Sequence, residues 1–276
     1  MNAVAMTGTG WGKNLRADAA LTNAARCWFL VAAAGQWIFA FYIAFFYGGA
    51  AASGHPEFWN KVLPHGYVPG NTVGNAALGV HLMFAAAITV AGTLQLIPQI
   101  RARLPRFHRW NGRLYVIAAF TMGLTGLYLV MSGRKVVGDA PQHIAVGINA
   151  ILIMLCAAMT WRYALARDFS THRRWALRLF LVVNGVWFFR VELMFWLFVN
   201  QGPVGFDPET FTGPFLTFLS FSQMLLPLAV LELYLRARDG REPIGKFATA
   251  AGLVVLTAAM GLGEFAAFMG MWLPRL

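Results

Sequence analysis

Four histidines are the residues of this chain best suited to chemistry inside a membrane. His81, His108, His143 and His172 each lie in, or at the start of, a separate apolar run. Ionisable residues in such runs are rare and usually functional, and imidazole is a common axial ligand of haem iron. The hypothesis that follows is that these four side chains ligate haem.

The depths of the four histidines suggest how they would pair. His81 and His143 lie near the outer ends of two apolar runs, whereas His108 and His172 lie at the inner starts of two others. Pairing His81 with His143, and His108 with His172, is the choice that keeps partners at the same depth. Bis-histidine ligation takes imidazoles from facing helices. The sequence therefore predicts two b-type haems, one near each face of the bilayer.

Three arginines are candidates for the haem environment. Arg190 lies deep in an apolar run, and an intramembrane arginine usually has a partner. A propionate of the outer haem, Glu192 and Glu264 are the candidate partners. Arg109 and Arg173 directly follow the two inner histidines, where they would hold propionates or tune the redox potential.

Structural roles explain some of the same residues. Histidine and arginine at an inner helix start also suit charge held near lipid phosphates. Trp110 and Trp175 suit an interfacial aromatic belt equally well. In the outer loop, His55, Glu57 and His65 either bind a metal, line a substrate entrance or are simply solvated. The structural and the functional interpretations of these residues both stay open at this point.

The elements that must position these residues are long apolar helices. The chain has 276 residues, of which 58% are hydrophobic and only 12% charged. A soluble domain carries about 25% charged residues, so a bilayer is the environment that the composition favours. Helices of about 20 apolar residues span a hydrocarbon core of about 30 Å. The predicted helices cover residues 27–48, 76–99, 108–131, 143–164, 175–199, 213–236 and 247–272.

The distribution of basic residues predicts the orientation of these helices. Lysines and arginines gather in the N-terminal segment and in the loops after the second, fourth and sixth helices. The positive-inside rule then puts the N-terminus inside, with 1–26 as a cytoplasmic tail and 27–272 as one transmembrane domain. A signal peptide cleaved near Ala50 to Ala52 is the alternative for the first run. The net charge of +11 is explained by this topology rather than by nucleic-acid binding.

An internal repeat organises the middle of the chain. The motif His108-Arg109-Trp110 is echoed by His172-Arg173-Arg174-Trp175, and a further histidine precedes each copy. Residues 76–131 and 143–199 therefore read as two duplicated hairpins that form a four-helix core. Helices 27–48, 213–236 and 247–272 would be peripheral.

These motifs resemble two families. The segment from His108 to Tyr115, with its HRWxGRLY pattern, resembles a bacterial family of multi-pass membrane proteins of unknown function. The histidine plan is similar to that of b-561 type cytochromes, in which four consecutive helices each provide one haem ligand. That resemblance implies the same two histidine pairs as above. The chain departs from the b-561 plan because its inner histidines lie at helix starts and it has seven helices rather than six.

The function predicted from these features is electron transfer across a bacterial inner membrane through two b-type haems. A quinol or another small redox molecule would be the partner, and a haem-dependent transmembrane oxidoreductase would be the enzyme class. A cofactor-free transporter or a protein that binds lipid or quinone is the alternative. The sequence favours no particular oligomeric state.

Overall fold

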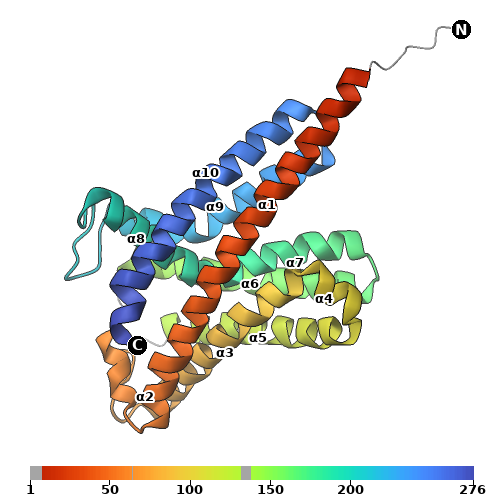
Figure 1. The fold of residues 1–276 in the computed structure, drawn as a ribbon. Coiled ribbons are helices and arrows are strands. Elements are labelled where there is room, and N and C mark those ends of the chain that lie inside the picture. Colours follow the sequence, from red (N-terminus) through yellow and green to blue (C-terminus); the bar gives the residue numbers. More distant parts are fainter. Residues whose placement is uncertain (1–7, 64, 132–137) are drawn as a thin grey trace, which may run out of the picture.

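The computed structural model describes residues 8–63, 65–131 and 138–276, and these are almost entirely helical (Figure 1). In chain order the helices are α1 Gly8–Tyr42, the π-helix η1 Ile43–Gly48, α2 Gly49–Ala52, the 3-10 helix η2 Pro56–Lys61, α3 Thr72–Leu96, α4 Pro98–Arg103, α5 Pro105–Met131, α6 Ala140–Leu165, α7 Phe169–Val183, α8 Gly185–Asn200, α9 Pro214–Asp239, α10 Pro243–Ala267, the π-helix η3 Phe268–Trp272 and the 3-10 helix η4 Leu273–Arg275. Within the described ranges, β pairing is limited to one isolated bridge between Asp207 and Thr212.

Six of these helices are long and apolar enough to cross a bilayer. They cover Asn14–Ala52, Thr72–Leu96, Pro105–Met131, Ala140–Leu165, Pro214–Asp239 and Pro243–Arg275. A bend of 55° separates α7 from α8, and the number of spans is seven if this pair is counted as one broken span. The predicted all-helical, polytopic membrane fold is thereby confirmed, and its helices imply a lipid bilayer as their surroundings.

Several helix starts lie earlier than the hydrophobic pattern indicated. α1 begins at Gly8, so the part of segment 1–26 that the structure describes is helical. α5 begins at Pro105 and α7 at Phe169. Proline suits the first turn of a helix, and the Asp168 carboxylate accepts a hydrogen bond of 3.1 Å from the Thr171 amide, which caps α7. Both inner histidines therefore lie one turn inside their helices rather than at the ends.

The break between α7 and α8 is stabilised by polar side chains. The Asn184 side-chain amide donates to the Phe180 carbonyl at 2.7 Å, and Asn149 of α6 donates to the Val182 carbonyl at 3.1 Å. A Cβ at Gly185 would lie 3.1 Å from the Asn149 amide nitrogen, so a larger residue would crowd this contact. Backbone groups inside a bilayer need such partners because water is absent there.

The predicted four-helix core is present as one packed cluster. Buried residues of α3, α5, α6 and α7 meet in it, among them Ile88, Tyr115, Ala157 and Leu179. α5 packs against α3 on one flank and against α6 on another, and α6 packs against α7. This packing determines which histidines can meet.

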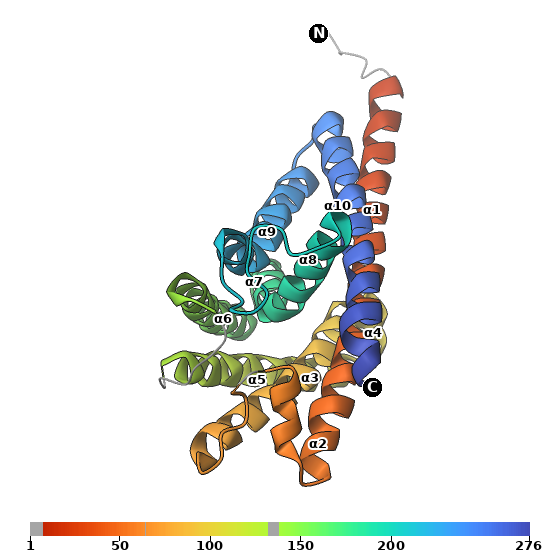
Figure 2. The same cartoon turned by 90° about the vertical axis from the view of Figure 1, so that its left-hand side faces the viewer.

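α1 and α10 run parallel beside each other, both beginning at the same end, and cross the core helices obliquely (Figures 1 and 2). α10 also packs against α8, where a Cβ at Gly263 would lie only 2.3 Å from the Val191 carbonyl oxygen. At the other end of α10, Lys246 forms an ion pair of 2.6 Å with Asp18 of α1. The arginine-rich segments also lie at this end of the molecule, which is called the inner end below.

Candidate functional site

A large cavity opens at the inner end between the core helices and the pair α1 and α10. Its volume is about 1630 Å³, and residues of α1, α3, α4, α5, α6, α7, α9 and α10 line it. Much of the wall is apolar or aromatic, with Trp28, Phe29, Val116 and Phe180 among its members. A cavity of this kind can take an apolar molecule.

Both inner histidines line this cavity. His108 projects from α5 and His172 from α7, and their imidazoles lie close enough to interact electrostatically. The predicted pairing at the inner end is thus possible in this fold. It depends on the helix starts at Pro105 and Phe169, which set both side chains one turn inside the bundle.

The His172 ring is held in one orientation. Its Nδ1 lies 3.0 Å from the Thr160 carbonyl oxygen of α6, so Nδ1 carries the proton and donates. The lone pair of Nε2 is then available to a metal, an arrangement that recurs among metal-binding histidines. Thr160 lines the cavity beside His172.

His108 is fixed through its backbone rather than through its ring. Gln95 of α3 donates to the His108 carbonyl at 3.0 Å, and Asn111 donates back to Ala91 of α3 at 3.0 Å. The His108 Nδ1 atom is buried and has no hydrogen-bond partner among the described residues. A buried ring nitrogen of this kind needs a proton donor, an acceptor or a metal.

Arginine is the charged residue that dominates the cavity wall. The six that line it are Arg26, Arg101, Arg109, Arg113, Arg167 and Arg173. No aspartate or glutamate is among the lining residues, and none of the six forms an ion pair within the described part of the chain. The predicted residues Arg109 and Arg173 are among them. Such a wall attracts carboxylate or phosphate groups.

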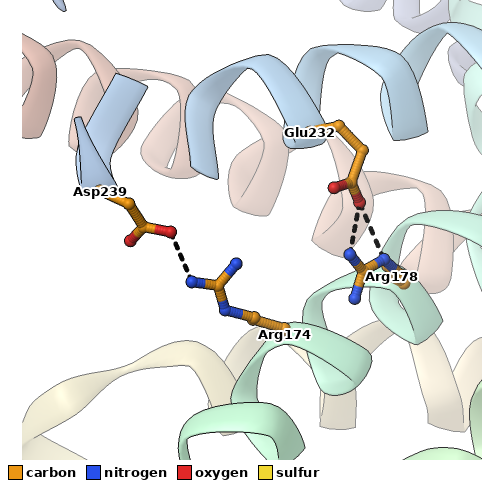
Figure 3. Close-up of polar contacts among 4 residues, drawn as sticks. All are labelled: Arg174, Arg178, Glu232 and Asp239. Atoms are coloured by element: carbon orange, nitrogen blue, oxygen red, sulfur yellow. Dashed lines mark hydrogen bonds and ion pairs between the residues drawn. The ribbon is translucent and has the colours of Figure 1, made fainter. Parts of the chain in front are cut away.

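Two neighbouring arginines of α7 behave differently, as Figure 3 shows. Arg174 pairs with Asp239 of α9 at 2.5 Å, and Arg178 pairs with Glu232 of α9 at 2.7 Å. Neither arginine lines the cavity. The acidic residues of α9 thus neutralise the arginines that clamp α9 to α7, while the cavity arginines keep their charge available.

The two outer histidines have different neighbours. His81 lies against α5, with Nδ1 3.1 Å from the Thr125 hydroxyl, and its Cε1 lies 3.6 Å from the Cβ position of Gly126. The His143 Nε2 atom is buried without a hydrogen-bond partner among the described residues. No hydrogen bond joins His81 to His143 within that part of the chain. α5 packs against both α3 and α6, which carry these two residues.

Arg190 has other neighbours than those predicted. Its guanidinium lies over the Phe39 ring at 5.4 Å and donates to the Val186 carbonyl at 3.2 Å. Among the described residues it forms no ion pair, and Glu192 hydrogen bonds instead with Ser222, a residue of α9. Among the described residues, an aromatic ring and a helix carbonyl thus take the place of Glu192 and Glu264 beside Arg190, and the propionate of an outer haem stays a prediction.

The outer-loop residues form a small exposed pair. His55 Nδ1 lies 2.9 Å from Glu57 Oε1, and this hydrogen bond holds the pKa of the Glu57 carboxyl below its usual value. The described residues contain no group of three histidine, cysteine or acidic side chains placed to hold a metal. The contacts thus point to a solvated pair at His55, and His65 has no assigned role.

Four cavity arginines were not singled out as site residues from the sequence: Arg26, Arg101, Arg113 and Arg167. Their clustering in inner loops was visible, but it also satisfies the positive-inside rule, so it could not distinguish topology from a binding wall. Gln95 and Thr160 were missed because their partners are backbone carbonyls of other residues.

Comparison with known proteins agrees with the membrane fold. No curated protein and no solved structure matches the chain. A family described as "Predicted membrane protein (DUF2306)" matches residues 78–208, which run from α3 to the loop after α8. The matched segment contains all four intramembrane histidines, whereas α1, α9 and α10 lie outside it. In its histidine-bearing core, the chain is therefore similar to a family of predicted membrane proteins.

Proposed function

We propose that this chain is a membrane electron carrier that binds haem b between His108 and His172. The observation that carries this proposal is that two imidazoles from different helices line one large cavity at the same end of the bundle. Electron transfer with a quinol or another small redox molecule is the activity that such a group would serve.

The residues present fit a haem in three respects. His172 has its Nδ1 hydrogen bonded to the Thr160 carbonyl, which leaves Nε2 free to ligate, and His108 has a buried ring nitrogen without a partner. The apolar wall suits a porphyrin face. Arg109 and Arg173, which lie beside the histidines in sequence and line the same cavity, would hold the propionates. A bis-imidazole haem supplies reversible one-electron chemistry when bound.

A second haem between His81 and His143 belongs to the same proposal but has less support. The unpartnered His143 Nε2 favours it, whereas the position of His81 against α5 does not. Electron transfer across the whole bilayer would need this outer group. One haem per chain would therefore indicate an electron carrier at the inner face, and two haems would indicate electron transfer across the membrane.

The test is the absorption spectrum and haem content of the full chain, expressed with haem supply and purified in mild detergent. The expected result is a Soret band, a bis-imidazole reduced α-band, and one haem per chain, or two if the outer site is filled. His108→Leu and His172→Leu should each remove the inner haem, and His143→Leu should change the content only if a second haem is present. His55→Leu, at an exposed outer-loop position, is the matched control. A colourless wild-type protein would overturn the proposal.

A second function is favoured by the number of cavity arginines. Haem has two propionates, whereas six arginines that form no ion pair among the described residues line the cavity at the inner end. Binding of an anionic phospholipid without a cofactor would use this excess of charge. Arginine recognises phosphate through paired N–H donors.

Native mass spectrometry in the presence of anionic and zwitterionic phospholipids tests this alternative. Phospholipid binding predicts colourless protein that retains the anionic lipid, and loss of that lipid when Arg101 and Arg173 are both changed to Gln. Arg174→Gln is the matched control, because Arg174 pairs with Asp239 outside the cavity. Equal retention of both lipid types would exclude a specific phospholipid site.

A further inference from the structure

A second polar region lies between α1, α8 and α10, away from the cavity and outside the histidine-bearing core. Glu264 lies in the last turn of α10 and faces Gly35, which lies about two turns before the end of α1. A Cβ at Gly35 would lie 2.3 Å from the Glu264 carboxyl carbon and 2.6 Å from Oε2. Only glycine leaves room for this carboxyl against the α1 backbone.

Buried polar atoms without partners occur at Glu264 and elsewhere on the helices that pack around it. Glu264 Oε1 is buried and makes no hydrogen bond among the described residues, and the same holds for both side-chain polar atoms of Gln36, which is 0% exposed. The indole nitrogens of Trp187 and Trp272 are also buried and make no hydrogen bond among the described residues. Both tryptophans belong to one packed cluster that also contains residues of α1 and α10. Each buried polar atom without a protein partner needs a proton, a water or an ion to satisfy it, and this applies first to the Glu264 carboxyl.

The charged groups near this region do not neutralise Glu264. Arg190 of α8 lies over the Phe39 ring and donates to its own helix, and Arg275 donates to the Met271 carbonyl. Glu192 hydrogen bonds with Ser222 of α9. No ion pair within the described residues involves Glu264. A carboxylate in the middle of a membrane without a cation is strongly disfavoured relative to the neutral acid.

We propose that Glu264 is an intramembrane proton-binding site. The ligand is a proton, which bonds to a carboxylate oxygen and gives the neutral acid that the surroundings of α1 and α10 favour. Gln36, adjacent to Gly35, offers one donor and one acceptor to the water that delivers or removes the proton. The site is independent of haem, since none of its residues lines the inner cavity.

A lipid-soluble carbodiimide tests for the neutral acid. The carboxyl proton goes to a carbodiimide nitrogen while a carboxyl oxygen bonds to the central carbon, and an oxygen-to-nitrogen acyl shift then gives a stable N-acylurea. Nothing leaves, so the adduct adds the full mass of the reagent. The full-length protein in lipid nanodiscs is treated with dicyclohexylcarbodiimide, and its peptides are mapped by mass spectrometry.

The expected result is an adduct on Glu264 but not on Glu232, which is paired with Arg178 and is the internal control. Glu264→Gln should lose the adduct and a carboxylic-acid C=O band in the infrared spectrum. Gly35→Ala should slow labelling, because its new methyl group displaces the carboxyl. Each variant is first checked for a wild-type elution volume. Equal labelling of Glu232, or absence of both the Glu264 adduct and the infrared band in wild type, would overturn the proposal.

Discussion

The contact between α8 and α10 makes a sharp stability prediction for Gly263→Ala. The new methyl carbon would lie 2.3 Å from the Val191 carbonyl oxygen, 2.9 Å from Val191 Cγ1 and 3.1 Å from Phe195 Cβ. The nearest atom belongs to helical backbone, so a side-chain rotation cannot relieve the clash. Overpacking of this kind costs about 1–3 kcal/mol. Helix separation must increase, which weakens the packing that small residues permit in membranes.

Gly252→Ala is the matched control in the same helix. A Cβ at Gly252 meets no atom within 4 Å. The substitution should therefore have only the helix-propensity effect, which favours alanine by up to about 1 kcal/mol. Any effect of replacing glycine by alanine in α10 that does not depend on the α8 contact appears equally in both variants.

Intrinsic tryptophan fluorescence during heating in one detergent at one scan rate provides the assay. A loss of about 2 kcal/mol corresponds to a Tm about 4–8 °C lower in a chain of this size class. Gly263→Ala should show such a decrease, while Gly252→Ala should match or exceed the wild-type Tm. Equal Tm values for the two variants would refute the close approach of α8 and α10.

Three further predictions concern the inner end and the broken span. A double-mutant cycle of Arg178→Gln and Glu232→Gln should give a coupling of about 0.5–1 kcal/mol in thermal stability, because both side chains are partly exposed; zero coupling would contradict the pair. Hydrogen bonds from the first turn of α7 lower the pKa of the Asp168 carboxyl in the folded protein. The stabilisation that this cap gives is therefore fully present above the pKa of Asp168 in the unfolded chain, and it is lost as the pH falls through the lower pKa of the folded protein. The protection factor at the start of α7, which is the intrinsic exchange rate at each pH divided by the observed rate, should fall at acidic pH in wild type and lose that dependence in Asp168→Asn. Asn149→Leu leaves the Val182 carbonyl without its donor and should cost about 1–3 kcal/mol, measured as a lower Tm than in Asn60→Leu, a change in the outer loop.

The inner cavity is lined both by residues of the segment that matches the family and by residues from outside it. α1, α9 and α10 contribute to its wall although the family match ends before α9. The two ion pairs between α7 and α9 position that outer layer (Figure 3). We therefore expect ligand binding at His108 and His172 to depend on α1, α9 and α10 as well as on the helices from α3 to α8.

Hydrophobic length and loop charge allowed the helical membrane fold and its spans to be predicted, because both are local properties of the chain. The break at Asn184 was not predictable, since asparagine and glycine also occur in unbroken helices, and the carbonyls they expose are satisfied by a residue of α6. The early helix starts were missed for a related reason: capping residues and prolines lie outside the apolar pattern.

For the site, the sequence by itself determined which residue types lie at each depth, and this was enough to anticipate that His108 and His172 share one end of the bundle. Only the tertiary structure decided which side chains meet. It packs α5 against the helices that carry His81 and His143, and it gives Arg190 an aromatic neighbour. It also places Glu264 against Gly35. The physical reason is that depth follows from distance along a helix, whereas contacts depend on how the faces of distant helices pack and cross.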